Sequence, residues 1–213
     1  MLTTIYLIRH GQTAWNKEEI FRGRTDIGLD ETGLKQAELV GRFLKNVKLD
    51  EIYSSPLSRA WQTAEKIAQF QNLKVQSLEG IIDMSFGDWE GHHHKDIKEV
   101  DGDTYRQWIE TPHRVRIPGG ETLDEVRKRA MASLEDVIKN HQGKNIVLVS
   151  HRVVNKVLIC GILGIDNSHF WQIAQDATAI NIIQYRNGRY VLSLMNDTCH
   201  LKDLKDEMVK IDF

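Results

Sequence analysis

The sequence predicts an α/β fold, a three-layer α/β/α arrangement with a mostly parallel central sheet and an antiparallel hairpin near the C-terminus. Runs rich in Ile, Val, Leu and Tyr alternate with helical patterns over the first two thirds of the chain, and this alternation is typical of parallel sheets. The later runs follow one another directly, which indicates antiparallel pairing. The expected strands are residues 3–8, 51–54, 145–150, 181–186 and 190–195.

Helical patterns fill most of the intervals between these strands. Over residues 32–47, apolar side chains recur at intervals of three and four, which places them on one face of a helix. Thr122 and Glu125 have the spacing of a capping box, so a second helix is expected to begin there. The apolar stretch RVVNKVLICGILG predicts a largely buried helix that ends near Gly161 or Gly164.

The dipeptide Asn187-Gly188 separates the last two strands. Both residue types accept the left-handed backbone of a type I′ turn, so a tight hairpin is expected. A chain of 213 residues suits one domain spanning 1–213. Residues 92–118 contain few apolar side chains, and we expect them to form a small flap insertion.

Composition excludes several classes of function. The 28 basic and 30 acidic side chains leave a net charge of −2, which predicts neither a nucleic-acid surface nor a membrane-binding patch. No window has the length of a membrane span, and the stretch MLTTIYLIRHG has no basic segment followed by a long apolar run, so we expect a protein that is not exported. Cys160 and Cys199 lie far apart and outside any metal-binding motif, so we expect reduced thiols in a cytoplasmic protein.

Two apolar strands end in a histidine. The stretch IYLIRHG places Arg9 and His10 directly after the first strand, and NIVLVSHRV places His151 after another. The carboxyl ends of parallel strands meet at one edge of a sheet, where ligands bind in open α/β folds. We therefore expect the two histidines to share a crevice.

An arginine is expected at the same edge. The stretch DEIYSSPLSRAWQTAEKIA runs from a strand into a helix, which we expect to start at Ser55 or Pro56. Arg59 then lies in or near the first turn, where unpaired backbone N–H groups favour anions. A single histidine or arginine at such a position is usually structural, but two of each at one edge indicate a site.

This combination of side chains favours phosphoryl transfer. Guanidinium groups match the oxygens of a tetrahedral anion, and they neutralise charge as a phosphoryl group moves. A neutral imidazole keeps a lone pair near neutral pH and can attack phosphorus. The reaction needs a carboxylic acid to protonate the departing alkoxide, and it needs neither a metal nor another cofactor.

These residues resemble the histidine phosphatase superfamily, also called phosphoglycerate mutase-like. Its motifs are matched in order by LIRHGQTAWN, SSPLSRAWQTA, FGDWEG, PGGET and VSHRVVNK, and NDTCHL is similar to its bacterial phosphatase branch. The resemblance implies that His10 is the phosphorylated nucleophile. It also implies a phosphate pocket made by Arg9, Arg59 and His151, with Asn16 contributing an amide. The main role of His151 would then be to stabilise the transferring phosphoryl group electrostatically, and its role as a base would be secondary.

The family's proton donor is usually a glutamate shortly before the FG-x-WEG motif, and this chain has Asp83 there. Aspartate is one methylene shorter, so either the backbone approaches the leaving group more closely or another carboxylate takes the role. The alternatives are Glu79, Asp88 and Glu90. We favour Asp83 as the acid, against the interpretation of a surface aspartate in a turn.

The sequence leaves the roles of three further features undecided. Arg152 stands where the family usually has glycine, and it either adds a cation to the pocket rim or, as we slightly favour, begins a helix and faces away. Arg22 either contacts substrate oxygens or is a solvated loop residue. The three histidines 92–94 are interpreted as a solvated loop, because consecutive residues cannot all face one metal ion.

The resemblance implies a phosphatase acting on a small phosphorylated metabolite, with alpha-ribazole phosphatase as one candidate activity. Mutases of the family carry a longer insertion between the WEG and PGG motifs, whereas only residues 92–117 intervene here. A mutase is the alternative, and a non-catalytic phospho-ligand-binding module is the second alternative. An anionic substrate is expected from the cations of this segment, Arg106, His113, Arg114 and Arg116. The sequence does not indicate an oligomeric state.

Overall fold

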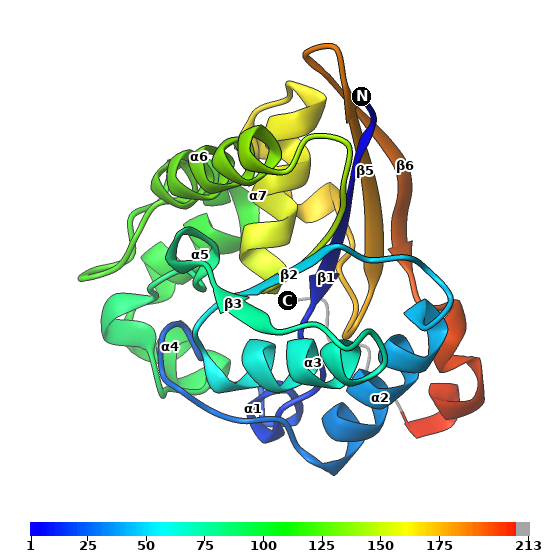
Figure 1. The fold of residues 1–213 in the computed structure, drawn as a ribbon. Coiled ribbons are helices and arrows are strands. Elements are labelled where there is room, and N and C mark those ends of the chain that lie inside the picture. The colour runs from blue at the N-terminus through cyan, green and yellow to red at the C-terminus, as the bar shows by residue number, and fades with distance from the viewer. Residues whose placement is uncertain (208–213) are drawn as a thin grey trace.

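A computed structural model of the chain describes residues 1–207, and a six-stranded sheet forms its centre (Figure 1). The strand order is β3-β2-β4-β1-β5-β6. Strands β1 to β4 run parallel to one another, whereas β5 pairs antiparallel with β1 and forms an antiparallel hairpin with β6. This confirms the predicted α/β fold. The strands are β1 (Thr3–Arg9), β2 (Glu51–Ser54), β3 (Val75–Ser77), β4 (Asn145–Ser150), β5 (Ile180–Arg186) and β6 (Arg189–Asp197).

Helices cover both faces of the sheet (Figure 1). Within residues 1–207, no helix is long and apolar enough to cross a membrane. The α-helices are α1 (Ala14–Lys17), α2 (Glu31–Leu44), α3 (Ser58–Gln69), α4 (His94–Val100), α5 (Gly102–Glu110), α6 (Leu123–Asn140) and α7 (Arg152–Leu163). Shorter 3-10 helices are η1 (Glu79–Ile81), η2 (Gly87–Trp89), η3 (Pro112–Arg114), η4 (Asn167–Gln172) and η5 (Cys199–Glu207).

The local signals in the sequence correspond to observed ends of elements. Helix α6 begins after a capping box in which the N–H of Glu125 donates to the Thr122 hydroxyl and the Glu125 carboxylate accepts from the N–H of Thr122. Helix α7 ends at Leu163 and is capped by Gly164, whose φ is +69°. At the hairpin, Asn187 and Gly188 have φ values of +52° and +77°, as a type I′ turn requires.

Strand β4 separates two hydrophobic cores. Ile146 and Leu148 face one core, which α6 and α7 close, whereas Val147 and Val149 face the other, which α2 and α3 close. All four side chains are fully buried. A strand buried on both faces reads as a continuous apolar run, which is why this segment is apolar at every position rather than at alternate ones.

Two elements differ from the sequence prediction. The sequence does not predict strand β3, because it is a three-residue edge strand without a run of apolar side chains. Helix α3 begins at Ser58, later than the predicted start at Ser55 or Pro56. A distant residue sets this start, since the Asp26 carboxylate accepts hydrogen bonds from the N–H and the hydroxyl of Ser58, both at 2.7 Å.

The carboxyl ends of β2, β4 and β1 lie side by side. Arg9 pairs with Ser150 across the parallel strands, and the N–H of His10 donates to the Ser150 carbonyl at 3.0 Å. On the other side, the N–H of Ser55 donates to the Val149 carbonyl at 3.0 Å. The first residues after three strands are therefore held at one edge, as predicted from the sequence.

The loop that follows β1 packs closely against helix α2. A Cβ atom on Gly33 would lie 2.0 Å from the carbonyl oxygen of Gln12, and one on Gly11 would lie 2.6 Å from the carbonyl oxygen of Gly33. The backbones touch at both places, so a side chain at either glycine displaces the loop that carries His10. The absence of a Cβ here is a packing requirement.

We predict that Gly33→Ala lowers the free energy of unfolding by roughly 1–3 kcal/mol, because the added methyl group overpacks a backbone contact. Gly102→Ala is the matched control, since a Cβ there meets no atom within 4 Å. Urea unfolding of both variants measures the difference. Equal stabilities would contradict the close approach.

Candidate active site

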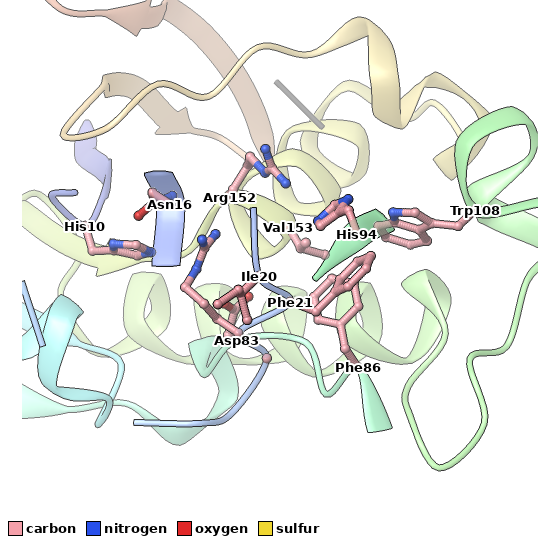
Figure 2. Close-up of a pocket in the computed structure, with 12 residues that line it drawn as sticks. His10, Asn16, Ile20, Phe21, Asp83, Phe86, His94, Trp108, Arg152 and Val153 are labelled. Atoms are coloured by element: carbon pink, nitrogen blue, oxygen red, sulfur yellow. The ribbon is translucent and has the colours of Figure 1, made fainter. Parts of the chain in front are cut away.

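His10 follows β1 and is almost completely buried, with 1% of its surface exposed. Its Nδ1 atom lies 2.6 Å from the carbonyl oxygen of Gly11. A carbonyl only accepts, so Nδ1 carries the hydrogen and the lone pair of the neutral ring is on Nε2. His10 lines the pocket shown in Figure 2.

The surroundings of His10 favour a neutral ring. Burial lowers its pKa well below the usual 6.5, and the nearby charges of Arg59, His151, Arg9 and Arg22 act in the same direction. An imidazole with a lowered pKa is unprotonated at physiological pH. Nε2 is therefore available as a nucleophile.

His151 comes from the end of β4 and lies beside His10, with 5.2 Å between the ring centroids. Its Nε2 atom is 2.7 Å from the Ser55 hydroxyl, and its Nδ1 atom is 3.4 Å from Oδ2 of Asp83. Burial, followed by the charge of Arg59, lowers its pKa well below 6.5. The structure thus brings together the two histidines that the sequence placed at strand ends.

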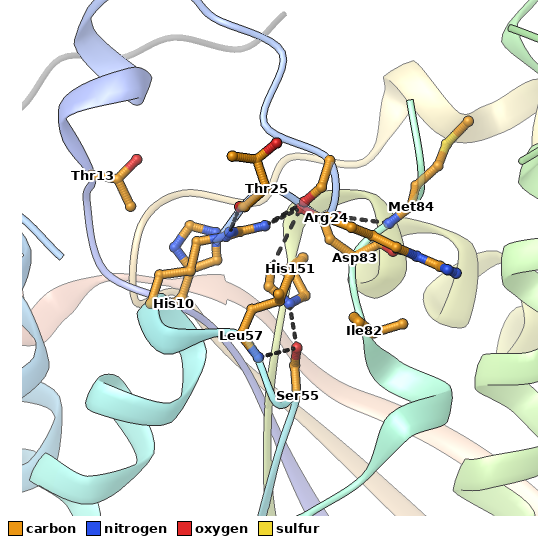
Figure 3. A network of polar contacts seen from close by, with 12 residues as sticks. His10, Thr13, Arg24, Thr25, Ser55, Leu57, Ile82, Asp83, Met84 and His151 are labelled. Carbon is orange, nitrogen blue, oxygen red and sulfur yellow. Dashed lines mark hydrogen bonds and ion pairs between the residues drawn. The ribbon is translucent and has the colours of Figure 1, made fainter. Parts of the chain in front are cut away.

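Arg59 is the second residue of α3 and is fully buried. Its guanidinium donates to the carbonyl oxygens of Thr25 at 3.0 Å and Gly23 at 2.7 Å, and to Oδ2 of Asp83 at 3.0 Å. Figure 3 shows the polar network around Asp83 and His151. These contacts hold the guanidinium next to His10, whose pKa it lowers more than any other charge does.

Arg9, the last residue of β1, is also buried. Its Nη1 atom donates to the carbonyl oxygen of Gln175 at 2.5 Å. The side chain of Gln175 is in turn held by Asn155 at 3.2 Å and by Asn181 at 2.8 and 2.9 Å. A buried amide network behind the sheet edge therefore orients this guanidinium.

Asp83 is buried, so the interpretation of a surface aspartate is wrong. Oδ1 accepts from the N–H of Met84 at 3.0 Å, and Oδ2 pairs with Arg59. Among the described residues that line the pocket, Asp83 is the only carboxylate. Of the alternatives, Glu79 and Asp88 are exposed, and Glu90 is tied to the N–H of Phe86 at 2.9 Å.

Asn16 and Arg22 both line the pocket. Oδ1 of Asn16 accepts from the N–H of Thr13 at 2.9 Å, which leaves its NH₂ group as the donor for a ligand. Burial lowers the pKa of Arg22 well below its usual value, and the charge of Arg9 contributes in the same direction. Because its Nε atom is buried and its side chain lines the pocket, Arg22 is not a solvated loop residue.

Two expectations about side-chain direction are wrong. Arg152 begins α7, but it lines the pocket instead of facing away. His94 begins α4 rather than lying in a solvated loop, and its ring stacks on Phe21 with 3.9 Å between centroids. Burial, with the charges of Arg152 and Arg22, lowers the pKa of His94 to about 4. Figure 2 shows both residues at the pocket.

Aromatic side chains form one wall of the pocket. Phe21, Phe86 and Trp108 line it together with Ile20 and Val153. Phe86 and Trp108 meet edge to face at 5.4 Å, and Phe21 and Phe86 lie 5.1 Å apart. The wall is apolar on the side away from His10 (Figure 2).

The predicted cations of residues 92–118 do not reach the pocket. Arg106 pairs with Asp103 at 2.8 Å, and Arg116 pairs with Glu125 at 2.6 Å, with both arginines mostly exposed. His113 and Arg114 are also absent from its lining. The cations that do line it come from elsewhere in the chain.

Sequence reasoning missed the functional setting of Ser55 and His94. Ser55 directly follows β2 at the same edge as His10. Its position at the end of a strand could therefore have identified it from the sequence. The histidine run carried no such signal, because His94 reaches the pocket only through the packing of α4 on Phe21. Within residues 1–207, no group of three His, Cys, Asp or Glu side chains could hold a metal ion.

Comparison with known proteins agrees with this geometry. The profile of the histidine phosphatase superfamily (branch 1) matches residues 5–198. Phosphoserine phosphatase 1 of Hydrogenobacter thermophilus is 37% identical over 98% of this chain and 99% of its own length. Adenosylcobalamin/alpha-ribazole phosphatase of Escherichia coli is 28% identical over 90% of this chain and 95% of its own.

Solved structures share the fold. Bacillus stearothermophilus YhfR superposes with a TM-score of 0.91 at 30% identity, covering 94% of this chain and all of that one. The family profile covers the strands that carry His10 and His151 and the helix that carries Arg59. The chain therefore belongs to branch 1 of the histidine phosphatase superfamily.

Proposed function

We propose that the chain is a metal-independent phosphatase that hydrolyses small phosphomonoesters through a phosphohistidine at His10. The observation that carries the proposal is the surroundings of one neutral imidazole. Its Nε2 lone pair is available, Arg9, Arg59 and His151 lie around it, and Asp83 is the adjacent carboxyl group. Membership of the family supports this reaction.

The first step transfers the phosphoryl group to the enzyme. Nε2 of His10 attacks phosphorus and forms an N–P bond as the P–O bond to the leaving alcohol breaks. Arg9 and Arg59 hold the phosphoryl oxygens, and neutral His151 supplies a further hydrogen bond. Asp83 gives its proton to the departing oxygen, so that an alcohol leaves.

The second step releases phosphate. A water molecule attacks the phosphorus of phosphohistidine, Asp83 accepts a proton from that water, and the N–P bond breaks to restore neutral His10. A phosphate dianion beside Asp83 favours the protonated acid in the first step, because two negative charges in one site repel each other. The Arg59–Asp83 pair of 3.0 Å places this carboxyl group next to the phosphate site.

The relatives suggest candidate substrates. Phosphoserine and alpha-ribazole phosphate are substrates implied by the names of two relatives, and both are phosphomonoesters. The segment 92–118 supplies His94 and Trp108 to the pocket wall, which supports its proposed role as a flap. Neither Cys160 nor Cys199 forms a disulfide, which supports the proposed cytoplasmic location.

We predict that His10→Ala abolishes turnover of p-nitrophenyl phosphate and eliminates the acid-labile phosphoprotein, because the attacking atom is lost. Rapid quenching with ³²P-labelled substrate, followed by acid and base treatment, measures the intermediate. His141→Ala is the control, since its ring contacts Tyr53 and neither residue lines the pocket. A fully active His10→Ala variant would falsify the proposal.

We predict that Asp83→Asn slows alkyl phosphates at least roughly 100-fold and p-nitrophenyl phosphate much less, because a nitrophenolate leaves without protonation. The kcat/KM values of both substrates are compared, with Asp88→Asn as the control, since Asp88 is exposed in the nearby 3-10 helix η2. Equal losses on the two substrates would assign the acid role to another group.

We predict that stability falls as the pH drops below 6.5. The pKa values of buried His10 and His151 are lowered in the folded state, so below the unfolded value of ~6.5 only the unfolded chain binds these protons. Each group then costs up to roughly 1.4 kcal/mol per pH unit. Urea unfolding from pH 7.5 to 5 should show a shallower decline for His10→Asn; an identical decline would mean that His10 is protonated when folded.

A further inference from the structure

We propose that the ion pair between Arg129 and Glu121 positions the acid of the reaction. The pair holds the backbone of the segment that carries Asp83, here called the acid loop (residues 79–86), and so sets how far the Asp83 carboxyl group reaches toward the leaving group. Neither is among the described residues that line the pocket, so both are positioning residues. The inference rests on the proposed phosphatase function, because it explains how the proposed acid of that reaction is placed.

Arg129 lies within α6 and binds the acid loop with its whole guanidinium. Nη1 donates to the carbonyl oxygens of Gly80 at 2.9 Å and Ile82 at 2.6 Å, and Nη2 donates to the carbonyl oxygen of Asp83 at 3.0 Å. Nε and Nη2 also donate to the two carboxylate oxygens of Glu121, at 2.9 and 3.0 Å. A guanidinium has five N–H groups in a rigid fork, and here each of them has one acceptor.

Glu121 connects this arginine to the far end of the acid loop. It belongs to the stretch PGGET, to which the proposed reaction gives no role. Its Oε2 atom accepts from the N–H of Ser85 at 2.9 Å, and its Oε1 atom pairs with Arg24 at 3.2 Å. Burial alone would raise the pKa of Glu121, but the hydrogen bonds from Arg129 and the Ser85 N–H lower it below its usual value. The carboxylate is therefore ionised at neutral pH, as the pair requires.

Strand β4 holds the same loop from another side. The carbonyl oxygen of Ile81, which lies between those bound by Arg129, accepts from the Ser150 hydroxyl at 2.7 Å. Ser150 ends β4 and directly precedes His151, so the loop is tied to the strand that carries the second histidine. Every carbonyl group of residues 80–83 is thus bound by a side chain from α6 or β4.

The short side chain of Asp83 makes its position depend on this backbone. Oδ1 is held by the N–H of Met84 at 3.0 Å, and Oδ2 faces Arg59 at 3.0 Å and Nδ1 of His151 at 3.4 Å (Figure 3). An aspartate has one methylene fewer than a glutamate, so a moving loop carries the carboxyl group with it. Proton transfer requires hydrogen-bond reach, and a displacement of about 1 Å can cost roughly 100-fold in rate.

Arg129 also acts on the site through its charge. Burial lowers the pKa of His151 most, and the charge of Arg129 adds to this effect. In the proposed reaction His151 contacts the phosphoryl group, so a change in its pKa affects every substrate alike. The position of Asp83 matters only for leaving groups that need a proton. A comparison of substrates therefore separates the two effects.

The dependence on the leaving group tests the position of the acid. Glycerol 3-phosphate needs a proton on its departing alkoxide, whereas p-nitrophenyl phosphate releases a stable phenolate. Arg129→Gln should lower kcat/KM for glycerol 3-phosphate by roughly 10- to 100-fold, and for p-nitrophenyl phosphate by no more than about threefold. The ratio of the two values cancels any loss of folded protein. Equal losses on both substrates, or no loss on either, would overturn the proposal.

Three further variants separate the hydrogen bonds from the charge. Glu121→Gln should lower the same ratio, because it removes the carboxylate that orients Arg129. Arg129→Lys keeps the charge but loses the fork, so its ratio should lie within about threefold of that of Arg129→Gln. A wild-type ratio in the lysine variant would assign the effect to charge and refute the positioning role. Arg42→Gln, the control, removes an exposed arginine–glutamate pair from α2 and should leave the ratio unchanged.

A double-mutant cycle tests whether Arg129 acts through Asp83. The acid is absent in the Asp83→Asn background, so Arg129→Gln should change the substrate ratio there by less than about twofold. A loss as large as in the wild-type background would show that Arg129 acts on another group, and the proposal would be wrong.

Hydrogen–deuterium exchange separates this proposal from the phosphatase function. Without substrate, Arg129→Gln should speed exchange in a peptide covering the acid loop at least roughly tenfold relative to wild type and to Arg42→Gln, because the loop opens more often. Faster exchange supports the hold on the loop even if the wild-type protein forms no phosphohistidine. Unchanged exchange would reject it while leaving the phosphatase function intact.

Discussion

The parallel register of β2, β4 and β1 is the constraint on which the site depends. Arg9 pairs with Ser150 in that register, and the backbone N–H groups of His10 and Ser55 continue the ladders beyond the strand ends. Two buried cores hold the three strands from both faces. Because a shift of one residue would turn every side chain to the opposite face, packing fixes the position of His10 relative to His151.

The site concentrates positive charge in a buried place. Arg9 and Arg59 are removed from water, and the fold compensates them with carbonyl oxygens and with Asp83. His10 and His151 are neutral in this setting, because burial and the nearby guanidinium groups both lower their pKa values. One set of arginines therefore forms the proposed phosphate site and keeps the proposed nucleophile, His10, unprotonated.

Sequence reasoning was most accurate in bringing the candidate catalytic residues to one edge of the sheet, and least accurate for the residues of the pocket wall. His10, His151 and Arg59 follow apolar strands whose ends are visible in the sequence, and the structure brings them together. Arg152 and His94 were assigned away from the site, yet both line it. Helix starts were predictable where the cap is local, as at α6, but not where a distant Asp26 caps α3.

The sequence by itself determined the fold class, the hairpin and the edge at which the candidate site lies, because apolar runs, caps and turn residues act over a few neighbouring positions. Tertiary structure decided which cations line the pocket. The arginines of residues 92–118 pair with acids on the surface, whereas Arg22 and Arg152 line the pocket. That choice depends on contacts between segments that are distant in the sequence, which no local pattern encodes.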